Sequence, residues 1–150
     1  MLNYPLLKSQ DDVDEDLVYE VKTLVMQCHN RKNKDGEPVI LKVIVESSEL
    51  NADQTKEATH ICLDAGADFI KTSTGMMTPS GKAGAAELDK VQIMRDIITE
   101  EGSDMKIKAS GGIRTMPDLQ KFAPYVDRFG VGFAAVDTIF GGAVSGDNTY

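Results

Sequence analysis

The chain has 150 residues, which suits one ordinary domain that buries roughly 68–70% of the surface of its unfolded chain. Hydrophobic residues make up 41% and charged residues 27%, as in soluble globular proteins, and no apolar run approaches the ~18 residues of a membrane span. The formal net charge of −8 argues against a nucleic acid as the main partner, because binding its phosphates needs clustered lysine and arginine.

The N-terminal residues lack the basic region and apolar stretch of a secretory signal, so a cytosolic protein is expected. The two cysteines, Cys28 and Cys62, form no CxxC motif and have no histidine at ligand spacing. We interpret them as free thiols within helices. No metal site and no cofactor are expected.

Helical stripes of apolar residues alternate with short β-branched runs along the chain. Asn51 and Gln54 predict a capping box at the start of one helix, and Gly66 ends it. Thr115 and Asp118 cap a later, short helix. The expected strands are residues 39–45, 67–71, 105–108 and 128–131. The expected helices are residues 12–29, 51–65, 88–98, a short one from 115, and 134–140.

This alternation predicts right-handed βαβ units, an α/β fold and a parallel sheet. Because side chains alternate along a strand, one face of the first strand carries Lys42, Ile44 and Glu46. The same face of the next strand carries Phe69 and Lys71, and that of the third carries Lys106 and Lys108. In a TIM-type (β/α)8 barrel such residues meet at the mouth formed by the C-terminal strand ends. The units are therefore expected to form part, about half, of such a barrel. One domain covers residues 1–140, and residues 141–150 form a flexible tail.

Lys71 directly follows the apolar strand residues Phe69 and Ile70. A lone lysine at a strand end can simply pack its stem on apolar surface while its amine reaches water. Lys108, however, occupies the equivalent position one βαβ unit later, so two ammonium groups can share one pocket. Like charge and partial desolvation both lower the pKa of an ammonium group, which yields the neutral amine that attacks a carbonyl.

A glycine loop follows Lys108 and leads into a helix N-terminus as Gly111-Gly112-Ile113-Arg114-Thr115. Glycines let backbone amides approach an anion, the helix dipole adds positive charge, and Arg114 offers a forked donor. The pattern is equally typical of a plain turn between strand and helix. Both a phosphate site and a structural turn remain open for this loop.

Three blocks of sequence carry a resemblance to a known family. They are Leu41–Glu46 with Glu49–Leu50, Ala65–Gly75, and Ile107–Thr115. In order and spacing, from about residue 13 to residue 140, the chain resembles the C-terminal part of deoxyribose-phosphate aldolases. The resemblance implies a β/α barrel that reversibly cleaves 2-deoxyribose 5-phosphate into acetaldehyde and glyceraldehyde 3-phosphate without a metal.

By the same resemblance, Lys71 is the lysine that forms the Schiff base and Lys108 is the neighbouring lysine that perturbs it. The terminal Tyr150 matches a tyrosine with a suggested role in proton transfer. The residues expected around the substrate and its phosphate are Lys42, Thr74, Gly75, Gly111, Gly112, Arg114 and Gly132.

The chain departs from the family pattern at two positions. Gly132 stands where the family usually has a serine of the phosphate pocket, so a hydroxyl group is missing there. Met76 stands where members often have lysine. The family's acidic residue for proton relay precedes the stretch that Leu2-Asn3-Tyr4-Pro5 resembles, and therefore precedes Met1.

A half barrel leaves unpaired strand edges and an uncovered inner face. The expected partners are therefore a sugar phosphate and either further copies of this chain, in a homo-oligomer, or a separate N-terminal half. No nucleic acid and no membrane is expected as a partner. The alternative function is a truncated, catalytically impaired aldolase-like module that binds a sugar phosphate or a protein.

Overall fold

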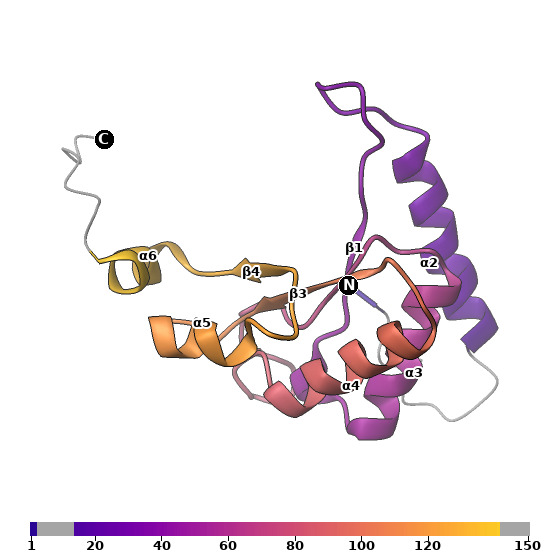
Figure 1. The fold of residues 1–150 in the computed structure, drawn as a ribbon. Coiled ribbons are helices and arrows are strands. Elements are labelled where there is room, and N and C mark those ends of the chain that lie inside the picture. The colour runs from indigo at the N-terminus through magenta and orange to yellow at the C-terminus, as the bar shows by residue number, and fades with distance from the viewer. Residues whose placement is uncertain (3–13, 142–150) are drawn as a thin grey trace.

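Each strand of this protein is followed by a helix, as the sequence predicts. The structure is a computed structural model that describes residues 1–2 and 14–141. Its strands are β1 (Lys42–Ile44), β2 (Phe69–Lys71), β3 (Lys106–Ser110) and β4 (Arg128–Gly130). They form one parallel sheet in the order β1-β2-β3-β4 (Figure 1). The expected α/β class and parallel pairing are confirmed.

The helices lie close to their predicted positions. They are α2 (Asp14–His29), α3 (Ala52–Asp64), α4 (Leu88–Glu100), α5 (Met116–Phe122) and α6 (Phe133–Phe140), with a 3-10 turn η1 (Ser47–Glu49). At α3, Gln54 N–H donates to Asn51 Oδ1 at 2.9 Å and Asn51 N–H donates to Gln54 Oε1 at 3.0 Å. The predicted capping box is therefore confirmed, and so is that of Thr115 and Asp118 at α5.

The first strand is shorter than the expected span of residues 39–45. Val39 N–H donates to the Arg31 carbonyl at 3.0 Å, so Val39 closes a turn with the chain after α2. At the other end, Glu46 has a left-handed backbone (φ 50°, ψ 58°) that no strand can continue. The apolar run over residues 39–45 predicts a longer strand, because an apolar pattern does not show where tertiary contacts make the chain turn.

The core lies between the sheet and helices α2, α3 and α4, which gather on one side of it (Figure 1). Every second strand residue, such as Val43, Ile70 and Ile107, is buried in this core. The intervening residues, such as Phe69 and Lys71, stand on the opposite face. Helix α2 contributes Leu17 to the core, together with Val21 and Val25. The fold therefore separates a helix-covered apolar face from a face that carries lysines.

The first residues of the chain lie beside the outer edge of β1. Leu2 N–H donates to the Ile44 carbonyl at 2.8 Å, and the Leu2 side chain is buried. This edge was expected to be unpaired, and the described part of the chain shows one backbone bond on it.

Among residues 1–2 and 14–141, no helix is long and apolar enough to cross a lipid bilayer.

Candidate active site

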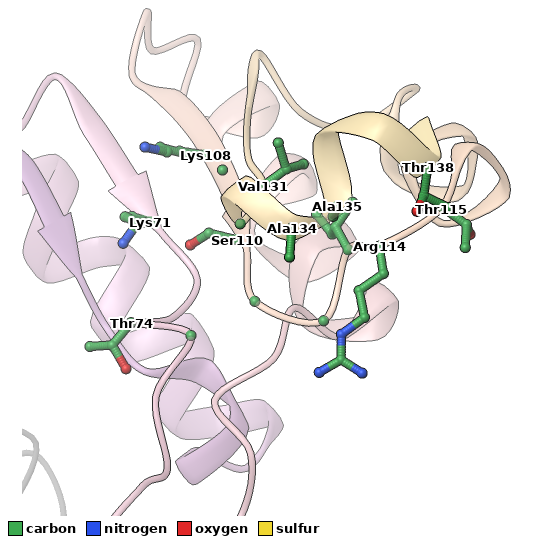
Figure 2. A pocket seen from close by; sticks show the side chains of 16 residues that line it. Lys71, Thr74, Lys108, Ser110, Arg114, Thr115, Val131, Ala134, Ala135 and Thr138 are labelled. Carbon is green, nitrogen blue, oxygen red and sulfur yellow. The ribbon is translucent and has the colours of Figure 1, made fainter. Parts of the chain in front are cut away.

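Lys71 and Lys108 are brought together by the strand register. Lys71 of β2 pairs directly with Lys108 of β3, and adjacent strands lie about 4.8 Å apart. Both side chains are half-buried on the lysine-bearing face of the sheet. Figure 2 shows the two lysines reaching from neighbouring strands into the same pocket. The pairing expected from their equivalent positions is present in the structure.

The surroundings of Lys71 lower the pKa of its ammonium group. Partial burial is the largest cause, because the charged form loses water, and the positive charge of Lys108 adds to it. The carboxylate of Glu46 acts in the opposite direction and raises the pKa of Lys71. Lys71 is therefore more readily neutral than an exposed lysine, which is the form that attacks a carbonyl.

A cavity of about 620 Å³ opens at the C-terminal ends of β2, β3 and β4. Ser110 and the residues from Gly130 to Gly132 contribute to its wall, and α6 closes one side with Ala134, Ala135 and Thr138. The sequence-predicted site residues that line it are Lys71, Thr74, Gly75, Lys108, Gly111, Gly112, Arg114 and Gly132.

Two of the predicted site residues are not part of this lining. Lys42 lies at the start of β1 and pairs with Phe69, whereas Ile44 is the residue that pairs with Lys71. The Lys42 amine stands 4.9 Å from the centre of the Phe69 ring, below the lysine pair. Tyr150 lies outside the described residues, as does most of the expected tail over residues 141–150.

The glycine loop is packed closely against the loop after β2. Gly111 and Gly112 have φ angles of +87° and +75°, a backbone that favours glycine. A Cβ atom on Gly111 would lie only 2.1 Å from the Gly84 carbonyl oxygen. A side chain at Gly111 is thus excluded both by its backbone and by the neighbouring chain.

Arg114 stands at the far end of the pocket from the lysines. Its exposed side chain extends from the glycine loop away from Lys71 and Lys108 (Figure 2). The backbone N–H groups of Arg114 and Thr115 both donate to Asp118 Oδ2 at 3.0 Å, and these bonds lower the pKa of Asp118. Those two amides are already occupied, so an anion here must use other donors.

Gly132 lies at a second place where an anion could bind. It immediately precedes the first turn of α6, and no side chain caps that helix. A Cβ atom on Gly132 would meet nothing within 4 Å. The N-terminus of α6 therefore faces the pocket with open space around it. Helix N-termini present unpaired N–H groups that favour negative charge.

A hydrogen-bond network joins the ends of β2 and β3, and sequence reasoning did not identify it. Thr72 Oγ1 and Ser73 Oγ both donate to the Ser110 carbonyl, at 3.0 and 2.5 Å. Ser110 N–H donates to Thr72 Oγ1 at 3.0 Å, and Ser110 Oγ donates to the Ser73 carbonyl at 2.7 Å. All three residues are buried. The sequence does show hydroxyl residues shortly after both lysines. Which of these hydroxyl groups bond one another depends on the register of β2 and β3, and the sequence does not show that register.

Glu46 was expected to share one strand face with Lys42 and Ile44, but β1 ends at Ile44 and Glu46 lies in the turn that follows, with contacts that the sequence did not predict. It is only 3% exposed, and its Oε2 accepts from Thr74 N–H at 3.0 Å and from Thr74 Oγ1 at 2.7 Å. Its left-handed backbone costs about 1–3 kcal/mol for a residue other than glycine. Both donors of Thr74 are thus committed to Glu46, so Thr74 lines the pocket without a free donor for substrate.

Metal ligands do not gather in the described part of the chain, where no group of three or more His, Cys, Asp or Glu side chains is arranged to hold an ion. Cys28 and Cys62 are free thiols. Burial raises the pKa of the Cys62 thiol to about 12, so this cysteine stays protonated and unreactive.

Comparison with known proteins identifies relatives over most of the chain. Residues 3–150 match the family described as DeoC/LacD family aldolase. A deoxyribose-phosphate aldolase of Caldicellulosiruptor saccharolyticus is 47% identical over 104 residues, which cover 69% of this chain and 41% of that protein. The crystal structure of a putative deoxyribose-phosphate aldolase from Coccidioides immitis has a TM-score of 0.74 and 31% identity, over 92% of this chain and 48% of that one.

A third relative is described as a tetramer. The deoxyribose phosphate aldolase from Aeropyrum pernix has a TM-score of 0.64 and 26% identity, over 83% of this chain and 48% of that one. The chain thus spans about half the length of these relatives. The expected fold class, about half of a TIM-type β/α barrel, is confirmed by the parallel sheet and these superpositions.

Proposed function

This chain belongs to the DeoC/LacD family of aldolases, and from that premise we propose that it carries the Schiff-base site of a deoxyribose-phosphate aldolase. The proposed reaction is the reversible cleavage of 2-deoxy-D-ribose 5-phosphate into acetaldehyde and D-glyceraldehyde 3-phosphate. Lys71 is the proposed nucleophile, and Lys108 is the proposed neighbour that keeps it reactive.

The chemistry follows from a neutral amine beside a carbonyl. Lys71 Nζ attacks the aldehyde carbon of the open-chain sugar, and loss of water leaves an imine. The protonated imine accepts the electrons of the bond between C2 and C3 as it breaks, while the C3 hydroxyl proton passes to a base. Glyceraldehyde 3-phosphate leaves, and the remaining enamine takes a proton at C2. Water then hydrolyses this imine to acetaldehyde and free Lys71.

One observation carries the proposal, namely that Lys71 pairs in register with Lys108 at the C-terminal end of the sheet. The register gives both amines one pocket, and the lowered pKa of Lys71 follows from that burial and charge. A lysine that merely ended a strand would need neither the second lysine nor the cavity. The pocket lies at the C-terminal ends of the strands, which is where β/α-barrel enzymes have their active sites.

The substrate phosphate is proposed to bind between the glycine loop and the N-terminus of α6. Gly111, Gly112 and Gly132 line this part of the pocket, the space beside Gly132 is open to an anion, and Arg114 adds positive charge at the same end. This places the phosphate away from Lys71, as the length of a five-carbon sugar requires. The missing hydroxyl group at Gly132 leaves the helix amides as donors there.

The proposed working form contains a second β/α half. Lys42 and Arg128 lie over the Phe69 ring, at 4.9 and 5.2 Å, on the face opposite the core. Another copy of this chain or a separate N-terminal half would cover this face and close the barrel. The Aeropyrum pernix relative, of which this chain covers 48%, is described as a tetramer, and this supports association between copies in general.

Trapping the imine tests the proposal directly. The full chain is incubated with deoxyribose 5-phosphate or acetaldehyde, reduced with borohydride, digested and examined by mass spectrometry. We expect a stable adduct on Lys71, and Lys71→Arg serves as the control that keeps the charge without a nucleophile. No adduct, or an adduct on another lysine in the parent chain, would contradict the proposed function. Binding of the sugar phosphate without an adduct would identify an impaired binding module instead.

A further inference from the structure

The segment between β1 and α3 places a buried carboxylate at the edge of the lysine pocket. Glu46 lies two residues after β1, while Lys71 ends β2 and Thr74 lies in the loop that follows it. Because Ile44 pairs with Lys71, the residues after β1 lie beside those after β2. Two backbone bonds hold them there, from Val45 N–H to the Lys71 carbonyl at 3.0 Å and from Ser47 N–H to the Thr72 carbonyl at 2.7 Å.

The Glu46 side chain is held in this place from several directions. One carboxylate oxygen accepts both the N–H and the hydroxyl of Thr74. The other oxygen, Oε1, is buried and makes no hydrogen bond within the described residues. It occupies space that Gly84 leaves open, since a Cβ there would lie 2.6 Å from Oε1. A buried carboxylate with a strained backbone and one oxygen without a hydrogen bond lowers the stability of the fold.

We propose that Glu46 is a positioning residue of this site, which holds the Thr74–Gly75 wall of the pocket in place and supplies the negative charge that balances the two lysines. The inference rests on the proposed function only in taking Lys71 as the nucleophile. Glu46 does not line the pocket and is not assigned contact with the substrate.

The charges around Lys71 explain why one carboxylate matters. Lys108 faces it from β3. Lys42 at the start of β1 and Arg128 at the start of β4 lie lower on the same face, where both stand over Phe69. Within the described residues, Glu46 is the acidic group that acts on Lys71 against this positive charge. Its loss would leave the ammonium form of Lys71 without that support.

The first test measures the pKa of Lys71 without any substrate. The full chain is labelled with limiting acetic anhydride across a pH series, and the labelled fraction of Lys71 is read by peptide mass spectrometry. Glu46→Gln keeps the shape and removes the charge, so the apparent pKa of Lys71 should fall. Glu46→Asp keeps the charge and should return the pKa toward the parent value. Glu49→Gln, which removes a charge one turn later, should leave it unchanged.

The second test measures how firmly the pocket wall is held. Glycine adopts the left-handed backbone without strain, so Glu46→Gly keeps the turn and removes only the carboxylate. Hydrogen exchange at the Thr74 amide should then become faster by tenfold or more, whereas Glu46→Gln retains an acceptor and most of the protection. Thermal melts of each variant identify any general loss of folding.

The two readings separate this inference from the proposed function. An unchanged or raised pKa of Lys71 in Glu46→Gln overturns the charge balance, and unchanged exchange at Thr74 in Glu46→Gly overturns the positioning role. Failure of borohydride trapping in the parent chain overturns the Schiff-base function, and it does so whatever the labelling and exchange results are.

Discussion

At the scale of single residues, the reactivity of Lys71 depends on a neighbour that carries the same charge. Lys108→Leu removes that charge while leaving an apolar side chain in its place. The pKa of Lys71 should rise, because Lys108 is one of the causes that lower it. Adduct formation at neutral pH should therefore fall and partly return at higher pH. Each unit of pKa changes the neutral fraction about tenfold under these conditions.

The pH profile of borohydride trapping measures this effect, and Lys106→Leu provides the control. Lys106 lies two residues earlier on the same strand and is exposed, so its removal should change the profile little. A Lys108→Leu profile that overlays the parent curve would exclude a role for Lys108 in tuning Lys71. A Lys108→Leu profile displaced toward lower pH would mean that Lys108 raises the pKa of Lys71, which is the opposite of the expected effect.

At the scale of elements, two aspartates fasten the starts of neighbouring strands in the same way. Asp68 Oδ2 accepts from the Leu41 N–H at 2.7 Å and lies 3.0 Å from His29 Nε2. Asp127 Oδ2 accepts from the Ile107 N–H at 2.8 Å and from Arg95 at 2.6 Å. Each carboxylate lies just before one strand and accepts from a backbone N–H at the start of the neighbouring strand. Each also contacts a helix side chain.

Removing one of these carboxylates should weaken the sheet rather than the chemistry. Asp127→Ala leaves the Ile107 N–H without this acceptor and removes the ion pair with Arg95, which keeps only its bond from Nε to the Tyr125 carbonyl. The free energy of unfolding should fall by about 1–3 kcal/mol. Urea denaturation followed by circular dichroism measures the change. Asp96→Ala, on the exposed side of α4, should stay within about 0.5 kcal/mol of the parent. Equal losses in both variants would contradict the fastening role.

At the scale of the whole molecule, the face of the sheet opposite the core is incompletely covered. Side chains of Lys42 and Arg128 lie over Phe69 where a barrel would place further strands. Ile44 on the same face is half-buried. A sheet face that carries a half-buried Ile44 and two cations stacked on Phe69 favours association with another β/α half.

We therefore expect the purified chain to sediment with a mass above that of one copy. Sedimentation equilibrium over a range of protein concentrations measures this, with trapping on Lys71 followed at the same concentrations. Adduct yield should rise as the oligomer forms, because closing the pocket desolvates Lys71 further. A single-copy mass at every concentration, with full turnover of deoxyribose 5-phosphate, would contradict the need for a second half.

Much of this protein could be predicted from local sequence because the responsible interactions are local. The alternation of strands and helices follows from side-chain periodicity, which the chain carries within windows of a few residues. The capping boxes at Asn51 and Thr115 join residues three positions apart. The equivalent positions of Lys71 and Lys108 follow from the repeat of the βαβ unit, so the sequence alone predicts that they lie side by side.

Only the tertiary structure decided what depends on register and on where a chain turns. Lys42 was expected at the pocket, but β1 pairs so that Ile44 stands beside Lys71 and Lys42 lies lower on the face. The bonds from Thr74 to Glu46 join residues 28 positions apart, and no local pattern reports them. Composition and periodicity describe which residues share a face, whereas the pairing of strands determines which of them meet.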